Sequence, residues 1–295
     1  MIKPIKNDIP GLLEYSGILV DAALAEDIGE GDVTTRAIVK KGQEGKAEFI
    51  AKEEMVVSGL FIAEMAFTRL DRKAVFKTKF KDGSRVRKGE VIATVTGGLG
   101  ALLTGERVAL NFLQRLSGIA TKTNGFVKAM KSSKTRLLDT RKTTPCLRPL
   151  EKYAVVSGGG TNHRLGLYDS VLIKDNHIMA AGSVTAAVAA VRKKHGDELA
   201  IEVEVTNMAE VKEALASSAD IIMLDNMKVP AMKKALALIG DKALVEASGN
   251  VDIANIGMVA STGVDFISAG ALTHSARAID ISMEVVSIWA KKNRK

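Results

Sequence analysis

The sequence predicts an α/β protein whose C-terminal half is a β/α barrel, and two features of that half support the prediction. From about residue 135, short apolar strands alternate with Ala-rich helices, and from 169 successive strands begin roughly 20 to 30 residues apart, as in parallel β-α units. Each apolar strand also ends in a polar residue or a glycine. The C-terminal ends of barrel strands meet at one mouth, where the chemistry of such folds is located.

The N-terminal part of the chain has a different pattern. A helical pattern covers 18–28, and three strand-like runs follow it, at 46–59, 74–80 and 90–97. The turn sequences KDGS (81–84) and RKGE (87–90) separate the last two runs, as expected for antiparallel strands. A long helix is then predicted over roughly 100–131, because its apolar residues recur at helical spacing.

Six predicted strands make up the barrel half. They are TRLLDT (135–140), SVLIKDN (170–176), AIEVEVTN (200–207), DIIMLDN (220–226), ALVEASGN (243–250) and VDFISAG (264–270). The helices predicted between them cover 183–196, 207–218 and 229–240. A doubly wound open sheet would also place function at strand ends. The barrel is favoured because six such strands follow one another and none is followed by a G-x-G-x-x-G turn.

Composition places the chain among soluble globular enzymes. Its hydrophobic fraction is 46% and its charged fraction is 26%. No uncharged run reaches the roughly 18 to 20 apolar residues of a membrane helix. The N-terminal MIKPIKNDIPG lacks the apolar region of a secretory signal, so we expect a cytoplasmic protein. The single cysteine, Cys146, excludes an internal disulfide and a multi-cysteine zinc site.

The net charge of +8 is compatible with a polyanionic ligand or with a role in solubility alone. Aromatic residues make up only 4% of the chain and the lysines are spread along it, which disfavours a nucleic-acid-binding surface. There is neither a dinucleotide fingerprint nor a G-x-x-x-x-G-K-[ST] loop, so nucleotide cofactors bound by those devices are disfavoured.

The strand ends and the segments beside them carry residues suited to an anion-rich ligand. Positive charge comes from Arg141, Lys142, His163, Arg164 and Lys174. Negative charge comes from Glu204 and Asp225, which could hold Mg²⁺ or sugar hydroxyls. Small residues with free backbone N–H groups, typical of phosphate sites, come from SGN (248–250) and AGA (269–271).

Several of these residues also have a purely structural interpretation. Arg141 and Lys142 could be solvated charges after a strand, and a histidine such as His163 is often structural. Glu202 and Glu204 alternate with apolar residues, so both or neither point into the barrel, and the pattern cannot choose between them. The glycines 158–160 predict a pliant backbone that wraps around a small ligand beside His163.

These motifs resemble the quinolinate phosphoribosyltransferase family. The run LLDTRKTTPCLRPLEKYAVVSGGGTNHRLGLYDSVLIKDNHI (137–178) carries the resemblance most strongly. Further matching segments are ALAEDIGEGDVTT (23–35), TGERVALNFLQRLSGIAT (104–121), EVEVTN (202–207), MLDNM (223–227), EASGNV (246–251) and ISAGALTHSA (267–276). The resemblance therefore extends over nearly the whole chain.

The resemblance implies a reaction and an architecture. Quinolinate and 5-phosphoribosyl 1-pyrophosphate would give nicotinate mononucleotide, pyrophosphate and CO₂ in NAD biosynthesis, with Mg²⁺ and without an organic cofactor. An N-terminal α/β sandwich (1–113, joined by 275–295) would pack on an incomplete α/β barrel (114–274). The protein would be a homodimer or a larger oligomer whose active sites are shared between subunits.

The resemblance also implies roles for individual residues. The quinolinate-binding set would be Arg141, His163, Arg164 and Lys174, and Arg107 would be the arginine donated by the partner subunit. Thr140 would also bind substrate. Lys142, Glu204 and Asp225 would be the catalytic groups around the pyrophosphate and its Mg²⁺, the two carboxylates holding the metal directly or through water. The 5′-phosphate cradle would be Ser248, Gly249, Asn250, Ala269, Gly270 and Ala271. Cys146 stands where the family usually has glycine, and its Cβ restricts the local backbone.

Three rival functions make different predictions. A related phosphoribosyltransferase with another acceptor, such as those associated with molybdenum transport, would fail an assay with quinolinate. A barrel aldolase would form a Schiff base at Lys174, whereas attack by the pyridine nitrogen needs no covalent intermediate. A nucleic-acid-binding protein without catalysis would bind duplex or single strands in a salt-sensitive way.

Overall fold

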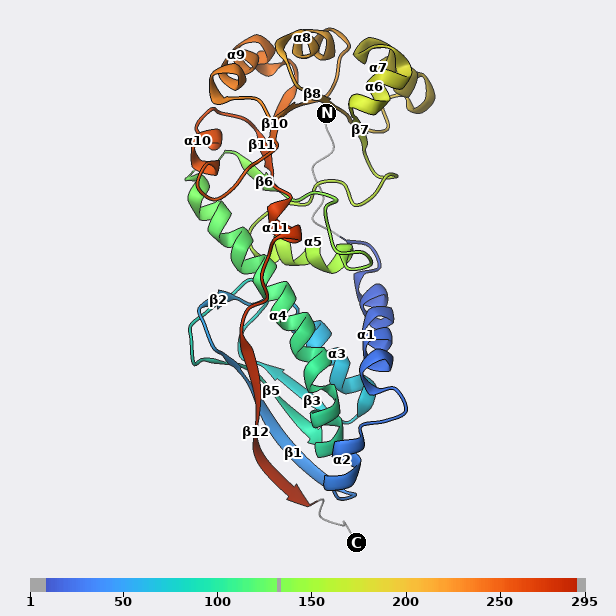
Figure 1. Cartoon of the computed structure of the whole chain (residues 1–295), viewed down its shortest axis with the longest axis vertical. Coiled ribbons are helices and arrows are strands. Elements are labelled where there is room, and N and C mark those ends of the chain that lie inside the picture. Colours follow the sequence, from blue (N-terminus) through green and yellow to red (C-terminus); the bar gives the residue numbers. More distant parts are fainter. Residues whose placement is uncertain (1–8, 132–133, 291–295) are drawn as a thin grey trace. The chain divides into compact units, whose positions relative to one another are not determined.

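The computed structural model describes residues 9–131 and 134–290, which form two compact units (Figure 1). We call them the sandwich unit (9–122, 149–159 and 276–290) and the barrel unit (123–131, 134–148 and 160–275). The sequence placed the boundary between 113 and 114. The structure places it between 122 and 123, inside the continuous helix α4 (Leu99–Met130), and assigns 149–159 to the sandwich unit.

The sandwich unit is built on a four-stranded antiparallel sheet. In spatial order its strands are β12 (Ile281–Ala290), β1 (Gln43–Ala51), β5 (Val91–Gly98) and β3 (Val75–Thr78). Side chains of β1 alternate between buried and partly exposed, which gives the strand one apolar face. From that face Phe49 packs edge-to-face against Phe67 of α3 (Leu60–Leu70).

The remaining elements of this unit are short or helical. They are α1 (Leu12–Ile28), α2 (Val33–Ile38), α5 (Arg148–Ser157, from its second residue on) and a two-stranded sheet of β2 (Met55–Val56) and β4 (Arg85–Val86). The predicted strand run 46–59 is therefore divided, with 52–54 between β1 and β2. β3 and β5 pair antiparallel as predicted, and β4 lies between the two predicted turns.

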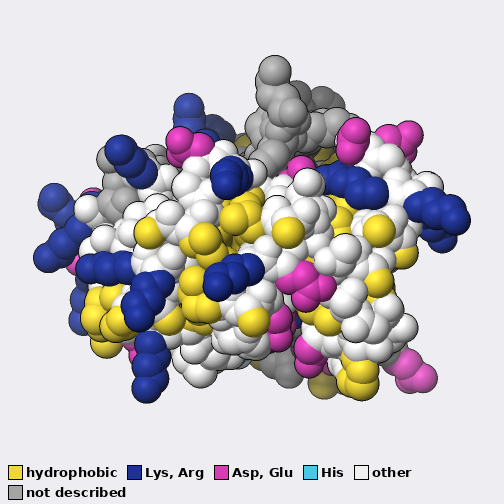
Figure 2. All heavy atoms as spheres, turned by 90° about the horizontal axis from the view of Figure 1, so that it is seen from above, with side chains coloured by type: hydrophobic (Ala, Val, Ile, Leu, Met, Phe, Trp, Pro, Cys, Tyr) yellow, Lys and Arg dark blue, Asp and Glu magenta, His cyan; other side chains and the backbone are white. Residues whose placement is uncertain are grey.

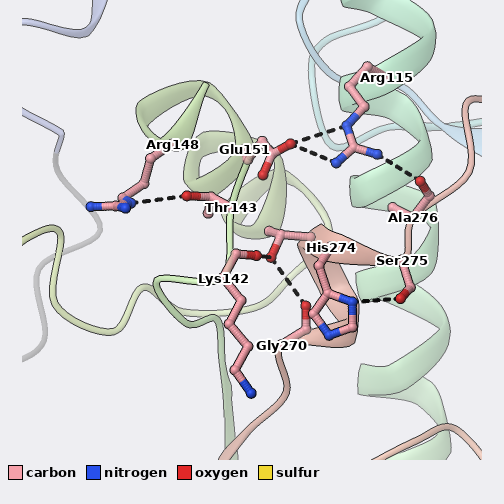
Figure 3. Close-up of polar contacts among 10 residues, drawn as sticks. Arg115, Lys142, Thr143, Arg148, Glu151, Gly270, His274, Ser275 and Ala276 are labelled. Carbon is pink, nitrogen blue, oxygen red and sulfur yellow. Dashed lines mark hydrogen bonds and ion pairs between the residues drawn. The ribbon is translucent and has the colours of Figure 1, made fainter. Parts of the chain in front are cut away.

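A buried ion pair ties α5 and the C-terminal segment to α4 within the sandwich unit (Figure 3). Glu151 of α5 is fully buried, and its Oε1 accepts hydrogen bonds from Arg115 Nη2 at 2.7 Å and Nε at 3.1 Å. Arg115 Nη1 donates to the carbonyl oxygen of Ala276 at 2.7 Å. Removing one partner of a buried pair is strongly destabilising, so this arginine helps to hold three separate segments together.

The barrel unit contains six parallel strands in the order β6-β11-β10-β9-β8-β7. They are β6 (Arg136–Leu138), β7 (Val171–Ile173), β8 (Ile201–Val205), β9 (Ile221–Asp225), β10 (Leu244–Ser248) and β11 (Phe266–Ser268). Each lies inside one of the six predicted strands. β6 and β7 do not pair with each other, so the sheet forms an incomplete barrel, as the resemblance implied.

Helices follow the strands of this unit. They are α6 (Asp175–Ala181), α7 (Val184–His195), α8 (Met208–Ala216), α9 (Val229–Ile239), the 3₁₀ turn η1 (Gly240–Lys242), α10 (Ile256–Ala260) and α11 (Ala271–His274). The predicted helices at 183–196, 207–218 and 229–240 correspond to α7, α8 and α9. Their starts are marked by a capping serine, a capping asparagine and a first-turn proline, namely Ser183, Asn207 and Pro230. In the described ranges, no helix combines the length and apolar character needed to cross a membrane.

The glycines 158–160 have a structural role that was not predicted from the sequence. α5 ends at Ser157, and the Gly158 N–H donates to the carbonyl oxygens of Ala154 and Val155. Gly159 has a φ of 92°, which an L-residue rarely adopts. These glycines end a helix, and the chain then enters the barrel unit, where Thr161 pairs with Leu138, the last residue of β6.

Candidate active site

All the predicted site residues except Arg107 belong to the barrel unit. Parallel pairing places Asp225 of β9 directly opposite Ser248 of β10 at the carboxyl ends of these strands. Ser248 Oγ accepts a hydrogen bond from Ser268 Oγ of β11 at 3.0 Å. Three neighbouring strands therefore bring polar side chains to one mouth, as predicted from their endings.

Two arginine side chains, those of Arg141 and Arg164, lie near each other at this mouth. Burial lowers the pKa of the half-buried Arg164, and the nearby positive charge of Arg141 lowers it further. Arg164 Nη1 donates to the carbonyl oxygen of Ser170 at 3.3 Å, which fixes its side chain, while Arg141 is exposed. Two like charges held close together favour binding of an anion, because the anion relieves their repulsion.

Lys174 follows β7 and pairs with the carboxylate of Glu204 on β8. The Glu204 side chain is 15% exposed and that of Lys174 is 43% exposed. A lysine predicted to bind one substrate and a glutamate predicted to bind the other are therefore joined in the free protein. The pair keeps both side chains at the mouth.

Beneath these groups lies a cluster that the sequence did not identify, formed by His163 with two glutamates. His163 Nε2 lies 3.0 Å from Glu202 Oε2 and 3.6 Å from Glu246 Oε2. Burial raises the pKa of Glu202 to about 7 and that of Glu246 to about 8, and the charge of Glu202 adds to the rise in Glu246. The signal that could have revealed Glu246 is its place in the middle of an apolar strand, where charged residues are rare.

The predicted contact of His163 with quinolinate stays a prediction, and the structure shows which protein groups its ring contacts. Its Nδ1 accepts a hydrogen bond from the Arg164 backbone N–H at 2.7 Å, and its Nε2 faces Glu202. Both ring nitrogens are engaged by protein groups, whereas a direct contact with a substrate carboxylate would need a ring N–H. Asp139, which was not predicted as a site residue, is fully buried and accepts from the His163 backbone N–H at 2.8 Å.

Glu204 and Asp225 have the chemistry of a Mg²⁺ site. Both are carboxylates at the C-terminal ends of the adjacent strands β8 and β9, and both are partly exposed. Asp225 Oδ2 accepts from Asn226 Nδ2 at 2.8 Å. Hard oxygen donors that remain accessible to water and phosphate suit Mg²⁺, so the residues fit the metal that the resemblance implies.

The SGN segment has the backbone of an anion cradle. Gly249 and Asn250 have φ angles of 90° and 50°, and Asn250 Nδ2 donates to Asn226 Oδ1 at 2.9 Å. A Cβ on Gly249 would lie 2.3 Å from that same oxygen. Glycine is required here both by conformation and by the close approach of Asn226.

Lys142 reaches the AGA segment (269–271), as Figure 3 shows. A Cβ on Gly270 would lie 2.9 Å from Lys142 Cδ and 3.1 Å from the His274 ring. Thr273 Oγ1 donates to the carbonyl oxygen of Lys142 at 2.7 Å. Thr140 shapes the turn before it, because its Oγ1 accepts from the Lys142 N–H at 3.1 Å. The end of β6 and the start of α11 thus bring a lysine to the predicted cradle.

For Arg107 and Cys146, the structure gives the exposure of the first and the backbone conformation of the second. Arg107 is exposed on α4 of the sandwich unit, and its predicted contact across a subunit boundary stays a prediction. Cys146 has a φ of 63°, so it adopts a left-handed conformation that favours glycine.

A parallel α/β barrel whose mouth combines clustered cations, two carboxylates and a glycine cradle defines an enzyme of phosphorylated, polyanionic substrates. Residues 32–117 match the N-terminal domain and residues 119–284 the C-terminal domain of quinolinate phosphoribosyl transferase. The chain belongs to the quinolinate phosphoribosyltransferase family.

Known relatives cover nearly the full chain. The chain is 50% identical over 266 residues to a probable carboxylating nicotinate-nucleotide pyrophosphorylase of Synechocystis sp., covering 89% of this chain and 90% of that one. A Bacillus subtilis protein of the same description is 45% identical, covering 90% and 92%. The crystal structure of NadC from Streptococcus pyogenes is 41% identical with a TM-score of 0.91, covering 96% and 99%.

Proposed function

We propose that this protein transfers the phosphoribosyl group of 5-phosphoribosyl 1-pyrophosphate to quinolinate and releases CO₂ and pyrophosphate, forming nicotinate mononucleotide for NAD biosynthesis in the cytoplasm. The observation that carries the proposal is the positive charge of Arg141, Arg164 and Lys174 near one barrel mouth. Quinolinate carries two carboxylates, and arginine binds a carboxylate through two parallel hydrogen bonds. The relatives named above carry the names of this reaction.

The mouth would hold the second substrate on its other side. The SGN and AGA segments would receive the 5′-phosphate through backbone N–H groups, with Lys142 beside them. Glu204 and Asp225 would hold Mg²⁺, directly or through water, and bind ribosyl hydroxyls. When bound, Mg²⁺ would neutralise charge on the pyrophosphate as it departs.

The chain's residues would act by positioning and by electrostatics. The pyridine nitrogen has a lone pair, so its attack on the anomeric carbon needs no base, and the residues need only align the two substrates. The nitrogen becomes cationic as the new bond forms and the bond to pyrophosphate breaks. Loss of CO₂ then leaves an electron pair on C2, which the adjacent cationic nitrogen stabilises until C2 takes a proton. This route needs no covalent enzyme intermediate and no organic cofactor.

We also propose a homodimer with shared active sites, in which Arg107 of the partner subunit completes the quinolinate site. The support for this is that Arg107 is exposed on α4 in a match to the family motif.

One assay tests the reaction. The protein is incubated with quinolinate, the phosphoribosyl donor and Mg²⁺, and nicotinate mononucleotide and CO₂ are measured together. Equal amounts of both products support the proposal, and Arg141→Ala serves as the inactive control. Turnover with another acceptor and none with quinolinate would replace it with a different phosphoribosyltransferase.

Two rival functions have their own tests. A Schiff base at Lys174 would be trapped by borohydride, which the proposed route excludes. On the face in Figure 2, Lys and Arg side chains are most numerous on the left and acidic ones on the right. Nucleic-acid binding is disfavoured because aromatic residues, on which bases stack, make up only 4% of the chain.

A further inference from the structure

The cluster of His163, Glu202 and Glu246 lies beneath the mouth, and both of its carboxyl groups are almost completely buried. Glu202 and Glu246 are 2% and 1% exposed, and burying carboxyl groups is costly unless their position serves the protein. They come from β8 and β10, while His163 comes from the segment after Thr161. Three separate parts of the barrel unit thus meet at one imidazole ring.

The hydrogen bonds of the ring fix its tautomer. A backbone N–H can only donate, so Nδ1 must accept from Arg164 N–H, at 2.7 Å, with its lone pair. The ring proton is then on Nε2, from which it is donated to Glu202 Oε2 at 3.0 Å. Glu246 Oε2, at 3.6 Å, completes the acidic side of the ring.

The same tautomer argues against a metal ion at this cluster, although its ligand atoms lie within 4.8 Å of one another. A metal at Nε2 would need the lone pair of that nitrogen. Both ring nitrogens would then lack a proton, which a neutral imidazole cannot provide. The cluster is a hydrogen-bonded brace.

We infer that Glu202 and Glu246 are positioning residues, which orient the His163 ring and through it hold the backbone of Arg164 where its guanidinium meets a substrate carboxylate. The ring links the barrel interior to the Arg164 N–H, and the backbone N–H of His163 is held by Asp139 at 2.8 Å. The inference rests on the proposed function, because that function gives Arg164 its ligand.

The kinetic test separates the two substrates. Glu202→Ala removes the acceptor of the Nε2 proton, and it should raise the KM for quinolinate about tenfold to 100-fold, since small misplacements at a site have effects of that size. The KM for the phosphoribosyl donor should stay unchanged, because Lys142 and the SGN segment do not depend on the ring. Glu202→Gln keeps an acceptor oxygen and should restore most of the quinolinate affinity.

A spectroscopic test applies even if a variant is too unstable for kinetics. The chain has four histidines, so the ¹⁵N signals of the His163 ring can be assigned by their loss in His163→Gln. The unmodified protein should show the Nε2–H tautomer. Glu202→Ala should shift the ring toward a mixture of tautomers, whereas Glu198→Gln, at an exposed site, should change neither the spectrum nor the kinetics.

Each outcome decides between the alternatives. An Nδ1–H ring in the unmodified protein, an unchanged quinolinate KM in folded Glu202→Ala, or an equal rise in both KM values would overturn the inference. Failure of the unmodified protein to use quinolinate would refute the proposed function instead. The tautomer and its response to Glu202→Ala, both measured without substrate, would then decide whether the brace exists.

Discussion

Raising the pH from about 5 to about 9 should destabilise the folded protein through the buried glutamate pair. The pKa of Glu202 is raised to about 7 and that of Glu246 to about 8, both chiefly by burial, from 4.5. Between pH 4.5 and 8 the folded state therefore binds more protons than the unfolded state. Under that condition the free energy of unfolding falls as the pH rises.

The magnitude follows from the size of the shift. A difference of one bound proton changes the free energy of unfolding by about 1.4 kcal/mol per pH unit. For Glu246 alone, the interval from 4.5 to about 8 corresponds to a loss on the order of 5 kcal/mol. This is an upper bound for that residue, because one proton shared between Glu246 and Glu202 stabilises both carboxyl groups, and their contributions to the free energy of unfolding are not independent.

Urea unfolding followed by far-UV circular dichroism, at a series of pH values, measures this loss. Glu246→Gln replaces the carboxyl group with a neutral amide of the same shape. It should remove the part of the pH dependence that Glu246 contributes and be more stable than the unmodified protein at high pH. The matched control, Glu198→Gln at an exposed site, should follow the unmodified protein. Parallel pH profiles for the unmodified protein and Glu246→Gln would refute the reasoning.

Three further changes have defined outcomes. Arg141→Ala should weaken quinolinate binding by about 2 to 5 kcal/mol, as measured by calorimetry. Mixing Arg141→Ala with Arg107→Ala, after subunit exchange, should restore some activity through one hybrid site. No recovery would argue against shared sites. Gly249→Ala places a Cβ 2.3 Å from Asn226 Oδ1 and should raise the KM for the phosphoribosyl donor about tenfold or more, with quinolinate affinity retained. Cys146→Gly should stabilise the protein by about 1 kcal/mol in urea unfolding, because it removes a Cβ at a φ of 63°.

The barrel could be predicted because its strands are buried on both faces. Apolar runs that end abruptly in Lys174, Glu204 or Asp225 reveal both the strand and the end that faces the mouth. The division into units could not be predicted in the same way. The apolar period of α4 continues without a break from one unit into the other, so nothing in the sequence marks residue 122.

The helix α5 was missed although its sequence contains two signals. Pro149 lies in its first turn, where a missing N–H costs nothing, and Gly158 and Gly159 follow its end. The glycines were assigned to a ligand because a histidine and an arginine follow them. Their conformation is explained by the helix end alone.

The buried glutamates show where strand pattern stops being informative. Residues two apart on a strand share a face, so Glu202 and Glu204 could not be told apart. Their depth differs, because Glu204 is one layer nearer the mouth. In the hydrogen-bond register, Glu204 of β8 and Glu246 of β10 both pair with Met223 of β9. Barrel strands are staggered by about one residue per strand along the barrel axis, which makes about two residues between β8 and β10. Glu202, two residues before Glu204, therefore lies at the same height along the axis as Glu246. The stagger of barrel strands, applied to β8 and β10, could therefore have predicted that Glu202 and Glu246 lie side by side.

The position of Glu202 near Arg164 gives one reason for a carboxyl group in the core. Arg141 and Arg164 repel each other when no substrate is bound, and the nearby carboxylate of Glu202 raises the pKa of Arg164 against that repulsion. Glu204 pairs directly with Lys174. Apolar residues of equal volume would avoid the cost of buried charge, but they would leave the cations of the empty mouth without internal counter-charge. A substrate dianion therefore enters a site whose cationic side chains are already in position, and it forms ion pairs with them without first having to bring them together.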